Sequence, residues 1–225
     1  EVEAPIIWVF LCQAKETGLV PYGISFNVGS QATYANAWSN GLLSIIPAIK
    51  KLSDEGVKLE VVNIGGGFPW QYKSSVNVPT IEKIAHNINE VRGRLPYQLQ
   101  LVAEPGRWLV ANAFSLIVSI IGKVKRGDIW WLYVDAGAYN ALLEAMPFQG
   151  SIRYNITATK EYKKADSRYT LTGPTCDSLD VIDNELYLPS DIEIGDKLTI
   201  HDTGAYSLAL STAFNGFPTP PTHQL

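Results

Sequence analysis

The 225 residues suffice to bury the core of one large domain or two smaller ones, and 46% hydrophobic with 18% charged residues is ordinary for a soluble globular protein. The net charge of −4, without a long basic cluster, excludes the usual profile of a nucleic-acid-binding protein. The two cysteines, Cys12 and Cys176, form neither a metal nor a disulfide pattern, which fits a reducing compartment. The apolar run 6–12 is too short to span a bilayer and lacks a cationic leader, so we expect a cytoplasmic protein without a membrane partner.

The first half of the sequence alternates predicted helices and strands. Apolar residues at helical spacing predict helices over 6–14, 34–52 and 81–91, with Gly18 and Gly56 as stop signals and Pro47 as a source of a kink. Continuous apolar stretches predict strands at 22–28, 59–64 and 99–103. Near-continuous apolar strands between helices indicate a parallel sheet covered by helices over residues 1–107.

The second half has the pattern of an all-β domain, and the boundary falls near residues 108–112. An apolar run rich in β-branched residues covers 108–123, and a Gly-Asp turn at 127–128 precedes a predicted strand at 129–134. Further short strands are predicted at 151–157, 169–172 and 198–201. The polar run 160–168 indicates a solvated hairpin loop, and the proline-rich tail 218–225 is expected to be extended.

The three predicted strands of the first half all end in polar or glycine-rich segments, namely Gly29-Ser30-Gln31, Gly65-Gly66-Gly67 and Glu104-Pro105-Gly106-Arg107. The carboxyl ends of parallel strands lie on one face, so these segments should converge. The glycines fit a phosphate cradle built from backbone N–H groups, or simply a tight turn. Buried Glu104 and Arg107 would be costly unless they met a ligand with a cationic and an anionic part.

Two segments of the second half also carry chemically useful groups. The turn at 173–177 places the Cys176 thiol beside the Asp177 carboxylate, although a buried, inert cysteine is the commoner outcome. Tyr206 follows Gly204-Ala205 and offers a hydroxyl, with a core tyrosine as the alternative. The three histidines, His86, His201 and His223, share no metal-like spacing, so we expect no metal site and no catalytic histidine; His86 should lie on a helix surface.

The sequence resembles a known family over nearly all of its length from about Gly23 onward. The segments SFNVGSQ, VVNIGGGFP, LVAEPGRWLVANAFSL, VDAGAYNAL, GPTCDSLDVI, IGDKL and GAYSLALSTAFNGF occur in the order found in the fold type III, pyridoxal-phosphate-dependent basic amino acid decarboxylases. The bacterial ornithine/lysine decarboxylase group is the most similar branch.

The resemblance implies an α/β + β fold. Residues 1–107 would form the last three or so βα units of a β/α (TIM-like) barrel, and residues 108–225 a mostly antiparallel β domain whose tail returns to the barrel. The family's earlier segment, with the lysine that binds the cofactor covalently, has no counterpart here. We therefore expect this sequence to be a fragment, to be completed by another chain, or to be a degenerate remnant. The resemblance also implies a homodimer with shared active sites.

The resemblance implies a role for each candidate residue. Glu104 would pair with the pyridine nitrogen of pyridoxal phosphate, Cys176 would enter the partner's site and protonate the α-carbon, and Asp177 would contact the distal amine of the substrate. The phosphate would be held by a set of donors: Ser30, Gly66, Gly67, Gly106, Arg107 and Tyr206. Asn27 replaces the family histidine that stacks on the cofactor ring.

These roles predict decarboxylation of a basic L-amino acid, most simply ornithine or lysine, to the polyamine precursor putrescine or cadaverine. The segment 144–149 departs from the acidic stretch with which the family reads a basic side chain. The alternative function is that of a catalytically inactive homologue acting by binding or dimerisation, which the missing lysine and Asn27 favour. Diaminopimelate decarboxylase ranks lower.

Overall fold

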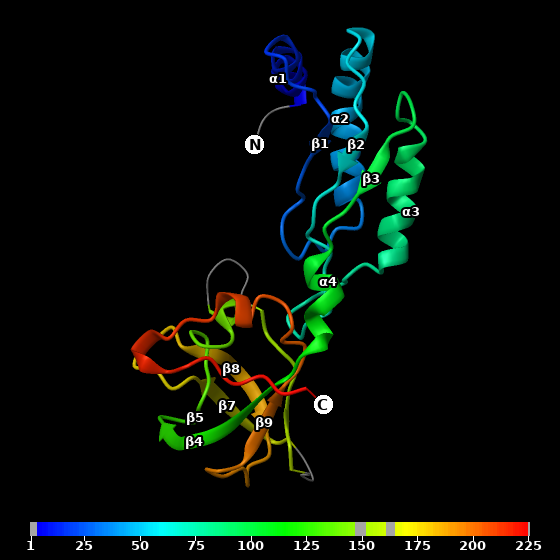
Figure 1. The fold of residues 1–225 in the computed structure, drawn as a ribbon. Coiled ribbons are helices and arrows are strands. Elements are labelled where there is room, and N and C mark those ends of the chain that lie inside the picture. Colours follow the sequence, from blue (N-terminus) through cyan, green and yellow to red (C-terminus); the bar gives the residue numbers. More distant parts are fainter. Residues whose placement is uncertain (1–3, 147–151, 161–164, 225) are drawn as a thin grey trace. The chain divides into compact units, whose positions relative to one another are not determined.

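The computed structural model describes residues 4–146, 152–160 and 165–224. The chain divides into two compact units, coloured along the sequence in Figure 1. Unit 1 comprises Glu1–Trp70 and Val76–Trp108, and unit 2 comprises Gln71–Ser75 and Leu109–Leu225. A short excursion of the chain, Gln71–Ser75, therefore belongs with the second unit although unit 1 surrounds it in sequence.

Unit 1 is a three-stranded parallel sheet with helices packed on it. The helices are α1 (Ala4–Glu16), α2 (Ala37–Asp54) and α3 (Ile81–Arg92), and the strands are β1 (Gly23–Ser25), β2 (Val61–Asn63) and β3 (Gln100–Val102). The strand order is β1-β2-β3, all parallel. Helix α1 packs beside α2, and α2 beside α3. The predicted alternation and the parallel sheet are confirmed, but the strands are shorter than their apolar runs.

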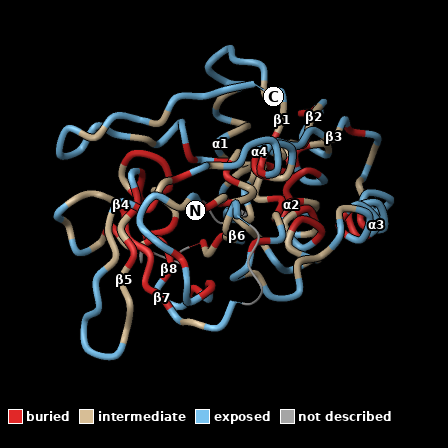
Figure 2. Tube along the Cα trace, turned by 90° about the horizontal axis from the view of Figure 1, so that it is seen from below, coloured by how far each residue is buried: buried red, intermediate tan, exposed pale blue. Residues whose placement is uncertain are grey.

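Helix α2 follows from its apolar stripe. The buried residues Trp38, Leu42, Ile45, Ile49 and Leu52 recur at helical spacing and form the centre of the unit 1 core. In Figure 2 part of the α2 trace is accordingly coloured as buried. Pro47 lies within the helix, on its exposed side. The helix ends before Gly56, whose φ of +75° belongs to the left-handed region, as the sequence predicted.

The sheet of unit 1 has one buried and one exposed face. Ile24 and Val62 are register partners and both are buried in the core. The next residues along the strands, Ser25 and Val102, are exposed and share the opposite face with Asn63. The expectation of a sheet covered by helices was therefore wrong for this second face, as far as the described residues go.

Unit 2 is a six-stranded mixed sheet. Its strands are β4 (Leu116–Arg126), β5 (Ile129–Val134), β6 (Ile156–Ala158), β7 (Ser167–Thr172), β8 (Val181–Leu188) and β9 (Lys197–Ile200), in the order β6-β9-β4-β5-β7-β8. Strands β5 and β7 are parallel, whereas the other neighbours are antiparallel. The first and last strands of this order, β6 and β8, also contact each other, so the sheet is nearly closed.

Short helical turns lie between β3 and β4 and at three later places in the chain. Helix α4 (Gly106–Val110) and the 3₁₀ turn η1 (Ala111–Ala113) precede β4, so the apolar run 108–123 is helical at its start. Three more 3₁₀ turns follow: η2 (Leu143–Ala145), η3 (Leu208–Leu210) and η4 (Phe214–Gly216). No helix among the described residues is long and apolar enough to cross a membrane.

Most predicted strands of unit 2 are present, with shifted bounds. The prediction at 129–134 is confirmed, and those at 169–172 and 198–201 correspond to β7 and β9. The strand expected at 151–157 is reduced to β6, and Ser151 lies outside the described residues. The loop expected at 160–168 was too long, since Ser167 and Arg168 belong to β7; residues 161–164 are not described.

Candidate functional site

The functional side chains of unit 1 follow the carboxyl ends of its three parallel strands. The register continues beyond the strands, since the Glu104 amide donates to the Gly65 carbonyl (2.9 Å) and the Phe26 amide to the Asn63 carbonyl (3.0 Å). Side chains two residues apart share a face, so Glu104 lies on the same exposed face as Val102. The sheet thus presents Glu104 on the side opposite its helices.

Glu104 is exposed, which corrects the expectation that it is buried. Its Oε1 accepts a hydrogen bond of 2.5 Å from Nδ2 of Asn63, at the end of the neighbouring strand β2. Asn63 was not identified from the sequence, where it is one polar residue within the apolar run LEVVNI. This amide orients the carboxylate at the strand end.

Arg107, by contrast, is buried, with 4% of its surface exposed. It lies in α4, directly after β3, and its Nη2 donates to the hydroxyl of Ser30 (3.3 Å), which follows β1. A buried guanidinium is costly unless it is paired. The Arg107–Ser30 pair brings together two predicted phosphate ligands from segments far apart in the sequence.

The glycine loop after β2 closes tightly on its neighbours. Gly67 has a φ of +84°, and a Cβ there would lie 2.0 Å from the Gly29 carbonyl oxygen, so only glycine fits. Its carbonyl accepts from the Ala32 amide (2.9 Å), and that of Gly66 accepts from Nε1 of Trp38 (3.1 Å). Within the described part of the chain, the N–H groups of Gly66 and Gly67 have no acceptor. Both remain available to an anion.

Two other predicted residues make local hydrogen bonds. The Asn27 Oδ1 accepts from the Gly29 amide (3.0 Å), so Asn27 shapes the turn after β1. The Gly106 amide donates to the Glu104 carbonyl (2.9 Å) and is thereby engaged. The sequence named Gln31 only as part of the strand-end segment and predicted no role for it. Its Oε1 accepts a hydrogen bond from the Trp70 amide (3.0 Å), and its Nε2 donates one to the Trp70 carbonyl (2.5 Å).

Unit 2 holds the Cys176–Asp177 turn, and both side chains are accessible. Cys176 is exposed, which contradicts the alternative of a buried, inert cysteine. Asp177 accepts from the Leu179 amide (2.8 Å) and from the Tyr139 hydroxyl (2.8 Å). These bonds lower the pKa of Asp177, the Leu179 amide having the larger effect. The same Asp177 bond is the main cause that raises the pKa of Tyr139.

The Cys176 thiol has a hydrogen-bond partner from the C-terminal part of the chain. Nδ2 of Asn215 lies 3.1 Å from Sγ of Cys176. Cys176 and Asp177 also line a cavity of about 330 Å³, together with Arg126, Trp131 and other residues of β5, β7 and the following turn. The guanidinium carbon of Arg126 lies 4.7 Å from the centre of the Trp131 ring. The turn therefore borders a concave, polar and aromatic surface.

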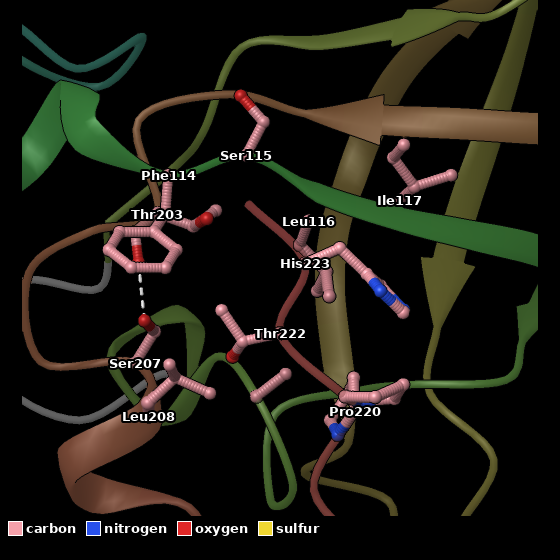
Figure 3. Close-up of a pocket in the computed structure, with 12 residues that line it drawn as sticks. Phe114, Ser115, Leu116, Ile117, Thr203, Ser207, Leu208, Pro220, Thr222 and His223 are labelled. Carbon is pink, nitrogen blue, oxygen red and sulfur yellow. Dashed lines mark hydrogen bonds between the residues drawn. The ribbon is translucent and has the colours of Figure 1, made fainter. Parts of the chain in front are cut away.

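Tyr206 is 45% exposed, so it is not a core tyrosine. The next residue, Ser207, is buried and donates a hydrogen bond to the Thr203 carbonyl, drawn as a dashed line in Figure 3. Ser207 borders a second cavity of about 310 Å³, which Phe114 and the tail residues Pro220 and His223 also line. Tyr206 and the strand-end residues Ser30 and Arg107 belong to different units.

The groups on unit 1 fit a ligand with an anionic and a cationic end. Arg107, the Ser30 hydroxyl and the N–H groups of Gly66 and Gly67 are donors of the kind that bind phosphate. The Glu104 carboxylate, held by Asn63, suits a protonated ring nitrogen. Unit 2 holds separately the Cys176 thiol and the Asp177 carboxylate, groups of the kinds that can donate a proton and bind an amine.

Comparison with known proteins finds relatives over most of the chain. A lysine/ornithine decarboxylase of Selenomonas ruminantium is 32% identical over 209 residues, which are 93% of this chain and 52% of that protein. Antizyme inhibitor 2 of Xenopus laevis is 31% identical over 224 residues, and the match covers 93% of this chain and 48% of that protein. The chain thus spans about half the length of these relatives.

A solved structure shares the fold. It is the lysine/ornithine decarboxylase of Vibrio vulnificus in complex with cadaverine, with a TM-score of 0.86 and 33% identity over 95% of this chain and 57% of that one. The family model for the pyridoxal-dependent decarboxylases, C-terminal sheet domain, matches residues 11–204. This chain therefore belongs to the pyridoxal-dependent decarboxylase family.

Proposed function

We propose that the protein carrying this chain is a pyridoxal-phosphate-dependent decarboxylase that converts ornithine or lysine to putrescine or cadaverine. The observation that carries the proposal is the strand-end arrangement of unit 1, where Glu104 and the Arg107–Ser30 pair follow neighbouring parallel strands. The names of the Selenomonas and Vibrio relatives support the substrate class. The proposal includes a β/α barrel completed by further strands and a homodimer with shared active sites.

Glu104 would act on the ring of the cofactor. Bound pyridoxal phosphate supplies an electron sink, since its protonated ring accepts the electron pair released when the carboxylate leaves as CO₂. A carboxylate beside the ring nitrogen keeps that nitrogen protonated. The bond from Asn63 at 2.5 Å holds Glu104 on the open face of the sheet, which is where such a ring would have to lie.

The phosphate would be bound by the donors at the ends of β1, β2 and β3. The Arg107 guanidinium would supply a positive charge and directed N–H donors to the phosphate. The Ser30 hydroxyl and the N–H groups of Gly66 and Gly67 would be its other hydrogen-bond donors. Tyr206 of unit 2 is proposed as a further ligand because the residue is 45% exposed and because of its place in the family segment. Gly106 would contribute by sharing the amide that it donates to Glu104.

Cys176 and Asp177 would act on the substrate. The Cys176 S–H bond breaks as a C–H bond forms at the carbon that lost CO₂, and the thiolate then regains a proton from water. The lowered pKa of Asp177 keeps it charged at neutral pH, as contact with the distal ammonium group requires. In a shared site these two residues would serve the partner subunit.

A second candidate function is that of a non-catalytic homologue that binds a partner. Asn27 supports it, because its side chain completes a turn with Gly29 and cannot stack on a ring as an imidazole does. The Xenopus relative is named as an inhibitor and not as an enzyme.

A CO₂-release assay separates these functions. The native polypeptide that carries this sequence is incubated with ornithine, lysine or meso-diaminopimelate, with and without added pyridoxal phosphate. We expect cofactor-dependent CO₂ from ornithine or lysine, with Glu104→Ala reducing the rate by at least about 100-fold and Glu90→Ala, on the exposed side of α3, leaving it unchanged. CO₂ from none of the three substrates would favour the non-catalytic function. Faster release from meso-diaminopimelate would contradict the proposed substrate and identify the protein as a diaminopimelate decarboxylase.

A further inference from the structure

We propose that Asn215 is a positioning residue for Cys176, holding the thiol toward its amide and stabilising the thiolate that remains after proton donation. The inference rests on the proposed function in naming Cys176 as the proton donor. The contact itself is a hydrogen bond of 3.1 Å between Nδ2 of Asn215 and Sγ of Cys176, residues 39 positions apart in the sequence.

The backbone at Asn215 is unusual for a residue with a side chain. Its φ of 56° lies in the left-handed region, and Gly216 follows with a φ of 81°. Asparagine tolerates this conformation better than most residues, at a small cost. The cost is understandable if the conformation aims the amide at a group that needs it, and Sγ of Cys176 is that group.

The turn that carries Asn215 is held in place by hydrogen bonds and a ring contact with Tyr139. Both the N–H and the hydroxyl of Thr212 donate to the Tyr139 carbonyl, at 2.9 and 3.2 Å. The Phe214 ring packs on the Tyr139 ring, with centroids 4.4 Å apart and an interplanar angle of 31°. Residues 212–215 therefore have a fixed place relative to the loop that carries Tyr139.

Tyr139 is in turn bonded to the residue after Cys176. Its hydroxyl donates to Oδ2 of Asp177 at 2.8 Å. The contacts thus close a ring through Cys176, Asp177, Tyr139, Phe214 and Asn215. Asp177 also accepts a hydrogen bond from the Leu179 amide. The residue next to Cys176 is therefore held by two donors, while Asn215 contacts the thiol itself.

The chemical effect follows from the direction of the bond. An amide N–H donates to sulfur and interacts more strongly with a thiolate than with a thiol. The thiolate is also the form that attacks alkylating reagents. Asn215 should therefore raise the reactivity of Cys176 toward iodoacetamide, a property measurable whether or not the protein decarboxylates anything.

Two variants separate this role from a purely structural one. Asn215→Gly keeps the left-handed backbone but removes the amide, and Asn215→Asp keeps the turn preference but replaces the donor with a negative acceptor. We expect iodoacetamide to alkylate Cys176 about three- to tenfold more slowly in Asn215→Gly and more slowly still in Asn215→Asp. Peptide mass analysis measures the extent of alkylation at each cysteine. Cys12, whose thiol donates a hydrogen bond to Glu55 in unit 1, is the internal reference.

The outcomes are decisive in both directions. Slower alkylation at Cys176 in both variants, with Cys12 unchanged, supports the proposal. An unchanged Cys176 rate in either variant overturns it, because a role confined to the turn predicts that outcome for Asn215→Asp. In protein that decarboxylates, the same variants should form more of the abortive transamination product. If the wild type releases no CO₂, the proposed function fails while the alkylation result still stands.

Discussion

At the scale of single residues, Asp177 carries the clearest electrostatic signature. The Leu179 amide and the Tyr139 hydroxyl both stabilise its charged form and lower its pKa. We expect Tyr139→Phe to raise the pKa of Asp177 toward, but not to, the ordinary value, because the larger contribution from Leu179 remains. A ¹³C NMR titration of the side-chain carboxyl measures it. Tyr133→Phe, at the same cavity, is the control and should not move it.

The sign of the pH dependence follows. A carboxyl whose pKa is lowered in the folded state stabilises the protein above the unfolded pKa, and this contribution is lost as the pH falls through the folded value. Tyr139→Phe should therefore reduce stability above the ordinary Asp pKa of 3.8 and have little effect well below it. An equal loss at all pH values would show that Tyr139 acts by packing and not through Asp177.

Sequence reasoning identified charged and nucleophilic residues better than their partners. Glu104, Arg107 and Cys176 stand out because glycine or proline turns flank them. Asn63, Tyr139 and Asn215 do not, although glycines lie near all three, because a neutral amide or phenol carries neither a charge nor a strong nucleophile that would mark it in the sequence. Their roles depend on which distant segment lies opposite, as with Asn215 and Cys176.

At the scale of elements, the segment Gln71–Ser75 contributes Lys73 to an ion pair with a buried carboxylate of unit 2. The Asp183 side chain is fully buried and accepts from Lys73 Nζ at 2.7 Å, while Tyr72 packs edge-on against Tyr154. We expect Lys73→Met to lower the free energy of unfolding by about 1–3 kcal/mol, since it leaves a buried carboxylate without its cation. The expected loss is smaller than for a fully buried ion pair because 35% of the Lys73 side chain is exposed.

Denaturant unfolding measures this cost, with Arg168→Met as the control. Arg168 pairs with Glu185 at 3.5 Å, both partly exposed, and such a surface pair contributes about 0–1 kcal/mol. A cost for Lys73→Met no larger than that for Arg168→Met would mean that the segment is held by Tyr72 and not by charge.

The helices were easier to predict than the strands. The stripe of α2 repeats over many turns, so its type was clear, whereas strands of three residues such as β1 are set by their neighbours. Strand β8 was missed because Asp183, Asn184 and Glu185 interrupt its apolar pattern. Asp183 is polar yet buried, and its placement follows from two partners that the apolar pattern does not reveal, the Lys73 ammonium (2.7 Å) and the Glu185 amide (2.8 Å).

At the scale of the whole molecule, we propose that two subunits share each active site. Glu104→Ala and Cys176→Ala each remove one component. If these components come from different subunits, a mixture of the two inactive variants should regain about a quarter of wild-type activity after subunit exchange, because half the dimers are mixed and each has one intact site. No recovery on mixing, with exchange verified by labelled subunits, would place both residues in the same subunit's site.

The arrangement of strand ends was the part of the site most accessible from sequence. Three successive parallel strands must place their carboxyl ends together, so the convergence of Ser30, the glycine loop and Arg107 followed from the pattern alone. The open face on which Glu104 lies did not follow, because apolar strands suggest burial on both sides.

The most direct test of the central claim asks whether these strand ends bind a phosphate. Calorimetry compares pyridoxamine 5′-phosphate with pyridoxamine, which differ only in that group and need no covalent bond to the protein. We predict that the phosphate form binds at least about 100-fold more tightly. Ser30→Ala should reduce that advantage about fivefold, and Ser44→Ala, on the exposed side of α2, should not. Equal affinity for the two compounds would contradict the account.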